Sequence, residues 1–93
     1  MLTSKERAEL RAKAHHLNAI FHVGKDGVSP PFVAGVRDAL EARELIKIDI
    51  LDNCPLDVKE AAEIVASRSG AEIVQIIGRK FVLYKKSKEK KGS

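Results

Sequence analysis

The fold is decided by the stretch Ile20-Phe-His-Val-Gly-Lys-Asp-Gly-Val-Ser-Pro-Pro31. Residues 20–23 read as a short strand that ends at a loop containing two glycines, Gly24 and Gly27. Ser29 suits the N-cap of a helix, and Pro30 suits its first position. The stretch therefore predicts a strand, a loop and a helix in direct succession.

A helix is predicted before this stretch, beginning at residue 3 or 4. Thr3 and Glu6 have the spacing of a capping box. Leu10, Ala14 and Leu17 recur at helical spacing and form its inner stripe. Four basic side chains are left mostly outside that stripe, namely Lys5, Arg7, Arg11 and Lys13.

The second half of the chain repeats the strand and helix pattern. A strand is predicted over residues 45–51, where isoleucine alternates with polar residues. Residues 52–55 interrupt this strand, and Pro55 can open a third helix that stops at Gly70.

A hairpin closes the domain. Two short apolar runs, 73–77 and 81–84, flank a turn at residues 78–80. The predicted order is α-β-α-β-α-β-β, an α/β fold with helices packed on a mixed sheet. We expect one compact domain over residues 1–86 and a flexible basic tail over 87–93, because that tail has no apolar residue to bury.

Charge is unevenly distributed along the 93 residues. Residues 1–27 carry a net charge of +2, residues 28–77 carry −4, and residues 78–93 carry +6. A fold that brings the ends together would have one basic face, which suits a polyanionic partner. A solvated tail that aids solubility is the alternative interpretation of the last stretch.

The composition also indicates where in the cell the protein is expected. No apolar run approaches the ~20 residues of a membrane span. The N-terminus is charged rather than a signal segment, and a single cysteine, Cys54, forms no internal disulfide. We therefore expect a cytoplasmic protein that does not bind membranes, and a monomer.

The loop Gly24-Lys25-Asp26-Gly27 is the strongest candidate site. A glycine loop that opens a helix places backbone N–H groups beside the positive end of the helix dipole, which suits a phosphate. The donors would be the amides of Gly27, Val28, Ser29 or Phe32, and Lys25 adds a positive charge. Asp26 works against this, and an ordinary turn is the alternative.

A second basic feature lies near the end of the chain. Arg79 and Lys80 sit in the predicted hairpin turn, and Lys85 and Lys86 follow the last strand. Lysines bind phosphates without reading a nucleotide sequence. The alternative for Arg79 and Lys80 is a solvated turn.

Other chemistries find little support in the sequence. His15, His16, His22 and Cys54 show none of the spacings that metal sites favour. No nucleophile and base signature and no nucleotide-binding motif occurs. We therefore expect no metal, no cofactor and no enzymatic activity. Phe21, Phe32 and Phe81 are expected in the core, so base stacking would be secondary.

Together, several segments resemble the CRM domain family (chloroplast RNA splicing and ribosome maturation), in particular its stand-alone bacterial members of the YhbY type. The resemblance covers residues 3–86. It rests on Leu10-Arg-Ala-Lys-Ala-His-His-Leu17, Val23-Gly-Lys-Asp-Gly-Val28, Ala39-Leu-Glu-Ala-Arg-Glu-Leu-Ile-Lys-Ile48, Gly70-Ala71 and Val74-Gln-Ile-Ile-Gly-Arg-Lys-Phe-Val-Leu-Tyr84.

The resemblance implies a four-stranded mixed sheet, similar to the C-terminal domain of translation initiation factor three. It also implies RNA binding through a GxxG loop, here Gly24 to Gly27, and a basic position at Arg79. Bacterial members of the family are associated with precursors of the large ribosomal subunit. Asp26 and Pro31 depart from the family pattern, which bears on the strength of the loop contact and not on the fold.

We therefore expect an RNA-binding assembly factor for the large ribosomal subunit, with its RNA precursor and the pre-ribosomal particle as partners. The residues expected to contact RNA are Gly24, Lys25, Asp26, Gly27, Val28, Ser29, Lys5, Arg7, Arg11, Lys13, Arg79, Lys80, Lys85 and Lys86. Two alternatives stay open. One is a protein-interaction module whose acidic middle, residues 38–63, docks a basic ribosomal protein. The other is a hydrolase or transferase whose site only the fold assembles.

Overall fold

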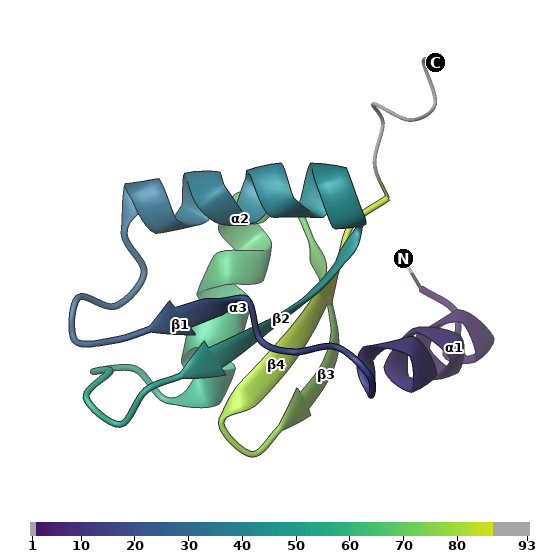
Figure 1. Ribbon diagram of the computed structural model, residues 1–93, viewed down its shortest axis with the longest axis horizontal. Coiled ribbons are helices and arrows are strands. Elements are labelled where there is room, and N and C mark those ends of the chain that lie inside the picture. The colour runs from purple at the N-terminus through teal and green to yellow at the C-terminus, as the bar shows by residue number, and fades with distance from the viewer. Residues whose placement is uncertain (1, 87–93) are drawn as a thin grey trace.

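The computed structural model describes residues 2–86, and the predicted flexible tail, residues 87–93, lies outside them. The elements follow the predicted order (Figure 1). They are α1 (Ser4–Ala14), β1 (Phe21–Val23), α2 (Pro30–Arg43), β2 (Leu45–Ile50), α3 (Val58–Ser69), β3 (Glu72–Ile77) and β4 (Lys80–Tyr84). Within the described part, no helix is long and apolar enough to cross a membrane.

Within residues 2–86 the strands form one four-stranded sheet in the order β1-β2-β4-β3. The strand β1 runs parallel to β2, while β4 is antiparallel to both β2 and β3. The predicted mixed sheet is therefore confirmed. The parallel pair arises because α2 connects β1 to β2, as a parallel crossover requires.

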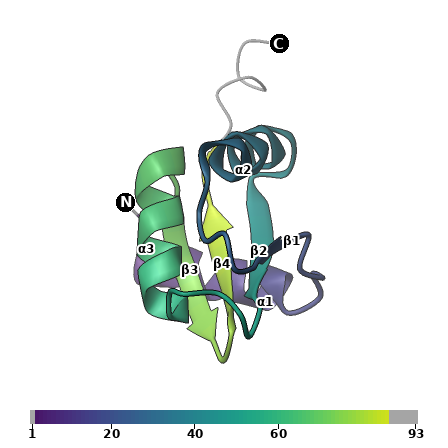
Figure 2. The ribbon, with the colours of Figure 1, turned by 90° about the vertical axis from the view of Figure 1, so that its left-hand side faces the viewer.

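The helices cover the two faces of the sheet unequally. On one face α2 and α3 pack against Ile46, Ile48 and Ile50 and the other alternating apolar residues of the strands, which form the main core. On the opposite face α1 covers a smaller cluster built on Ala14 and Val82. Figure 2 shows α2 and α3 beside the sheet, and Figure 1 shows α1 at the end of the molecule away from the β1–α2 loop. Among the described residues, no helix covers the remaining part of this second face.

One predicted cap on each of the three helices is confirmed. Thr3 and Glu6 form a reciprocal capping box at the start of α1. The Ser29 hydroxyl accepts a hydrogen bond from the Phe32 amide at 3.3 Å, at the start of α2. Gly70 ends α3 in the left-handed conformation, with φ of 75°. These caps satisfy backbone groups that a helix leaves unpaired at its ends.

The prediction that Pro55 opens the third helix is wrong. Asp57 is the N-cap of α3, and its carboxylate accepts a hydrogen bond from the Glu60 amide at 2.8 Å. Glu60 in turn accepts from the Asp57 amide at 3.3 Å. This capping box satisfies two orphan amides, whereas a proline at the first position satisfies none. The residues before Asp57 form turns instead.

The hairpin is tighter than predicted. Only Gly78 and Arg79 form the turn, and β4 already begins at Lys80. Gly78 has a φ of 57°, a conformation that favours glycine. Because Lys80 belongs to the strand, its side chain has a fixed side of the sheet rather than a place in a solvated turn.

Candidate functional site

Three connections meet at one end of the molecule, which we call the loop end. They are the β1–α2 loop (residues 24–29), the β2–α3 loop (residues 51–57) and the β3–β4 turn (Figure 1). The Leu51 amide donates to the Val23 carbonyl at 2.9 Å and so ties the first two together. Asn53 and Leu51 lie against Gly24, and Pro55 lies against Gly27.

The β1–α2 loop is a closed turn. The Gly27 amide donates to the Gly24 carbonyl at 3.0 Å, and the Phe32 amide donates to the Ser29 hydroxyl. Two of the four amides predicted to hold a phosphate are therefore engaged inside the protein. Within residues 2–86, the amides of Val28 and Ser29 have no acceptor, so these two remain as donors at the start of α2.

The two glycines of the loop differ in what they require. Gly27 has a φ of 66°, where a side chain is strained. Gly24 does not have a positive φ, and an added Cβ would meet Asn53 and Leu51 at an ordinary 3.5 Å. Between them Lys25 and Asp26 are exposed at the tip. Gly27 shapes the turn, whereas Gly24 lies against the β2–α3 loop.

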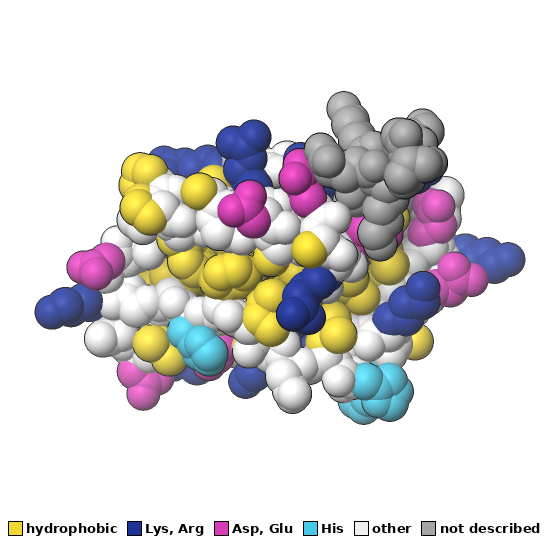
Figure 3. All heavy atoms as spheres, turned by 45° about the horizontal axis from the view of Figure 1, so that its top comes forward, with side chains coloured by type: hydrophobic (Ala, Val, Ile, Leu, Met, Phe, Trp, Pro, Cys, Tyr) yellow, Lys and Arg dark blue, Asp and Glu magenta, His cyan; other side chains and the backbone are white. Residues whose placement is uncertain are grey.

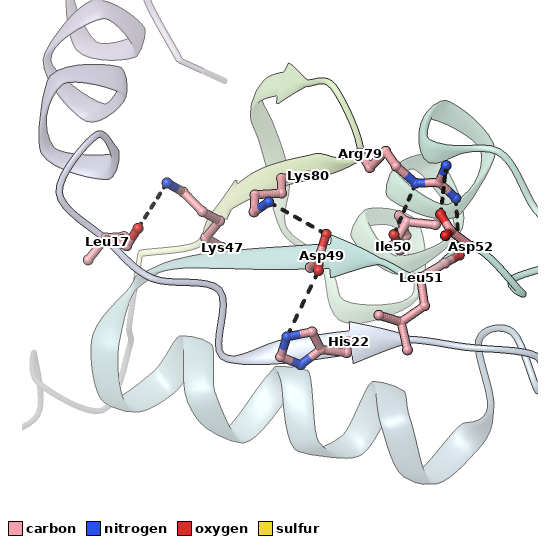
Figure 4. A network of polar contacts seen from close by, with 9 residues as sticks. All are labelled: Leu17, His22, Lys47, Asp49, Ile50, Leu51, Asp52, Arg79 and Lys80. Atoms are coloured by element: carbon pink, nitrogen blue, oxygen red, sulfur yellow. Dashed lines mark hydrogen bonds and ion pairs between the residues drawn. The ribbon is translucent and has the colours of Figure 1, made fainter.

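Arg79 lies against the neighbouring loop instead of projecting freely from the turn. Its Nε donates to the Ile50 carbonyl at 3.3 Å, and its Nη2 donates to the Leu51 carbonyl at 3.2 Å. Its Nη1 lies 3.1 Å from an oxygen of Asp52, whose side chain is 94% exposed (Figure 4). The sequence predicted Arg79 as a basic surface position. The structure shows that it also joins the β3–β4 turn to the β2–α3 loop.

Lys80 belongs to a polar row across the sheet that the sequence did not indicate. His22, Asp49 and Lys80 are register partners on β1, β2 and β4. His22 Nε2 lies 4.0 Å from one Asp49 oxygen, and Lys80 Nζ lies 3.8 Å from the other (Figure 4). Strand alternation shows that such residues share a face, but only the pairing register sets them side by side.

Lys47 lies on the same face and closer to α1. Its Nζ donates to the Leu17 carbonyl at 2.9 Å, just beyond the end of α1 (Figure 4). Lys47 thus ties the segment that follows α1 to β2. Sequence reasoning also missed this contact, because it joins residues 30 positions apart.

The other predicted basic residues lie at the α1 end of the molecule. Lys5, Arg11, Lys13 and Lys86 are exposed there. Arg7 donates to the carbonyls of Ile73 and Val74, and so is partly committed to β3. Lys85 Nζ donates to the Ser69 carbonyl at 3.3 Å. Arg7 and Lys85 thus hold the fold together at this end.

The two ends of the described chain do come together. A cavity of about 250 Å³ is lined by Leu2, Glu6, Gly70, Glu72, Tyr84, Lys85 and Lys86. Hydrogen bonds from Thr3 lower the pKa of the Glu6 carboxyl. Burial, and secondly the negative charge of Glu44, raise the pKa of the Tyr84 hydroxyl.

The predicted site residues therefore form two groups at opposite ends of the molecule. The loop end holds residues 24–29, Arg79 and Lys80, and the α1 end holds the rest. Figure 3 shows Lys and Arg side chains spread over one face, at both ends and also beside a band of hydrophobic side chains that runs along its middle. Among residues 2–86, no group of three metal-ligating side chains converges. The arrangement offers anion contacts at two separate places.

Comparison with known proteins gives a consistent result. The CRS1/YhbY (CRM) domain family matches residues 2–85. The "Probable RNA-binding protein YqeI" of Bacillus subtilis is 50% identical over 91 residues, which are 98% of this chain and 95% of the relative. An "RNA-binding protein" of Haemophilus influenzae is 31% identical over 97% of this chain and 91% of its own length.

The fold has a solved counterpart. The solution structure of the hypothetical protein SAV1595 from Staphylococcus aureus superposes with a TM-score of 0.79. The two chains are 42% identical, and the match covers 95% of this chain and 92% of that one. The α/β architecture described above is therefore shared along almost the whole of both chains.

Proposed function

The chain belongs to the CRS1/YhbY (CRM) domain family, and from this premise we propose that it is an RNA-binding domain that grips the RNA backbone at its loop end. The observation that carries the proposal is the near full-length match to relatives named for RNA binding. These relatives are named for RNA binding, so the proposed role is binding without catalysis.

The chemistry of the loop end supports this role. The amides of Val28 and Ser29 lie at the N-terminus of α2, where the helix dipole favours an anion. Lys25 adds a positive charge at the loop tip, and Gly24, which has no side chain, would let a phosphate come close to the backbone. Pro30 and Pro31 provide no amide donors, so Val28 and Ser29 would supply the backbone contacts.

Recognition would then depend on RNA shape and backbone more than on base stacking. Phe81 is fully buried. Phe21 and Phe32 are partly buried, and they pack against the main core and against each other with ring centroids 5.6 Å apart. Phe81 cannot stack on bases, and the other two rings are engaged in packing. The basic residues of the α1 end would give the RNA a second, separate contact.

The RNA that we propose is a precursor of the large ribosomal subunit, bound within the pre-ribosomal particle in the cytoplasm. This narrower proposal follows from the resemblance to stand-alone bacterial members of the family. The protein would act as a monomer that holds or protects a ribosomal RNA fold during assembly.

Binding at the loop end is tested with Lys25→Ala, and Arg68→Ala on the exposed surface of α3 serves as the matched loss of charge. Fluorescence anisotropy with large-subunit ribosomal RNA fragments is measured at several salt concentrations. Lys25→Ala should lower the affinity and reduce the slope of log K against log salt by about 0.7–0.9. Equal effects from both variants would argue against a specific loop contact.

The ribosomal role is tested by sedimenting a cell lysate through a sucrose gradient and following the protein with an antibody. Co-migration with free large subunits or their precursors, lost at high salt, is the expected result. A protein that stays at the top of the gradient at low salt would contradict the ribosomal role, even if purified RNA is bound.

A further inference from the structure

Asp49 is a carboxylate that lies between two basic side chains on the uncovered part of the sheet. His22 is its register partner on β1, and Lys80 is its partner on β4. Adjacent strands are separated by about 4.8 Å, so both basic groups can reach the same small space above Asp49. Ile77 continues this row on β3, and 57% of this residue is exposed.

The contacts within the row are loose. The distances of 4.0 Å to His22 and 3.8 Å to Lys80 are longer than the 3.2 Å limit of a normal N–H···O hydrogen bond. The side chains of His22 and Lys80 are each 52% exposed, whereas that of Asp49 is 23% exposed. Exposed ion pairs of this kind contribute little to stability, so another anion can replace the carboxylate at small cost.

The row borders the loop end. His22 is two residues before Gly24, and Lys80 directly follows Arg79. On this face α1 packs on the other part of the sheet, around Val74, Val82 and Tyr84. Nothing among the described residues covers the row, so an RNA strand that leaves the loop end can continue across it.

We propose that His22 and Lys80 form a second phosphate-binding position for RNA, and that Asp49 competes with the phosphate for them. This inference rests on the proposed function and adds a control of affinity to it. The carboxylate takes the place that a phosphate oxygen would take between the two basic groups. When RNA binds, Lys80 exchanges Asp49 for the phosphate, while the remaining negative charge of Asp49 repels the RNA.

Two consequences follow from a built-in competitor. Neutralising Asp49 should strengthen RNA binding, although the variant leaves every direct contact to RNA in place. The gain should also depend on Lys80, because in the variant its ammonium no longer has to leave a carboxylate in order to contact the phosphate. If Asp49 only repelled the RNA, replacing it would raise the RNA affinity whether or not Lys80 is present.

The test compares Asp49→Asn with Asp38→Asn, which removes the same charge from the exposed surface of α2. RNA affinity is measured by anisotropy with large-subunit ribosomal RNA fragments. Asp49→Asn should bind about 5- to 10-fold more tightly than the wild type, with a salt slope larger by about 0.7–0.9. Asp38→Asn should change the affinity less than 2-fold, about the effect of a distant screened charge.

A double variant, Asp49→Asn with Lys80→Ala, should lose the gain, and thermal melting of each variant verifies that it is folded. If the wild type binds RNA and Asp49→Asn binds no better than Asp38→Asn, competition by Asp49 is refuted while the proposed function stands. If only Asp49→Asn binds RNA, competition by Asp49 is supported, and its carboxylate blocks RNA binding in the wild type. If neither binds RNA, both proposals are refuted.

Discussion

Replacing the two loop glycines one at a time separates the folding role of the loop from its proposed binding role. Gly24 and Gly27 delimit the same turn, but only Gly27 has a positive φ, of 66°. Gly24→Ala places a methyl group 3.5 Å from Asn53 and Leu51, which is ordinary van der Waals contact. Gly27→Ala places its methyl group 3.8 Å from Pro55, so space is not its difficulty either.

The expected stabilities therefore differ for a conformational reason. Left-handed backbone costs a non-glycine residue about 1–2 kcal/mol, so Gly27→Ala should lower the free energy of unfolding by that amount. For a domain of 60–100 residues, this corresponds to a fall in Tm of about 4–16 °C. Gly24→Ala should be neutral or should stabilise by about 0.5 kcal/mol, because alanine restricts the unfolded chain.

RNA binding should show the opposite order once both variants are folded. If a phosphate approaches the backbone over Gly24, the added methyl group blocks it, and Gly24→Ala should lose about 10-fold in affinity, the worth of one hydrogen bond to a charged group. Thermal melting by circular dichroism and RNA anisotropy below both Tm values are the measurements. A Gly24→Ala variant that melts normally and binds RNA like the wild type would refute the close approach at Gly24.

Three further predictions concern other parts of the fold. In Arg79→Lys the lysine lacks the guanidinium fork that holds the carbonyls of Ile50 and Leu51. Amide hydrogen exchange over residues 51–56 should therefore quicken by about 5- to 10-fold. Unchanged exchange would show that Arg79 does not restrain this loop. Gly70→Ala strains a residue with φ of 75° and should cost about 1–2 kcal/mol; an unchanged Tm would contradict this. The lowered pKa of Glu6 means that its charge stabilises the fold above its unfolded pKa and ceases to do so as pH falls through the folded value. The Tm difference between wild type and Glu6→Gln should therefore shrink as the pH falls from about 7 to about 3, and a constant difference would count against it.

Local signals accounted for most of the element boundaries. The Ser29 cap, the Pro30 start and the Gly70 stop each involve residues within one helical turn. All the residues that take part are therefore close together in the sequence. The start of the third helix is the exception. Pro55 was predicted to open it, but α3 begins after Asp57, whose reciprocal capping box with Glu60 satisfies two backbone amides.

The candidate site was less predictable than the fold. The loop of residues 24–29 was visible because its glycines and the N-cap are consecutive. The internal contact of the Gly27 amide was not visible, and neither was the attachment of Arg79 to the carbonyls of Ile50 and Leu51. These bonds depend on how the chain closes on itself, which residue types alone do not specify.

From the residues alone we could predict the order of helices and strands, the apolar faces that build the core, and the basic character of the two ends. These properties follow from periodicity, capping and charge, which act between residues close in the chain. Which charges are neighbours depends instead on how the folded chain brings distant residues together. The register of β1, β2 and β4 placed His22 and Lys80 on either side of Asp49. The packing of α1 on one part of the sheet separated its basic residues from the loop end, because strand pairing and helix docking join residues far apart in the chain.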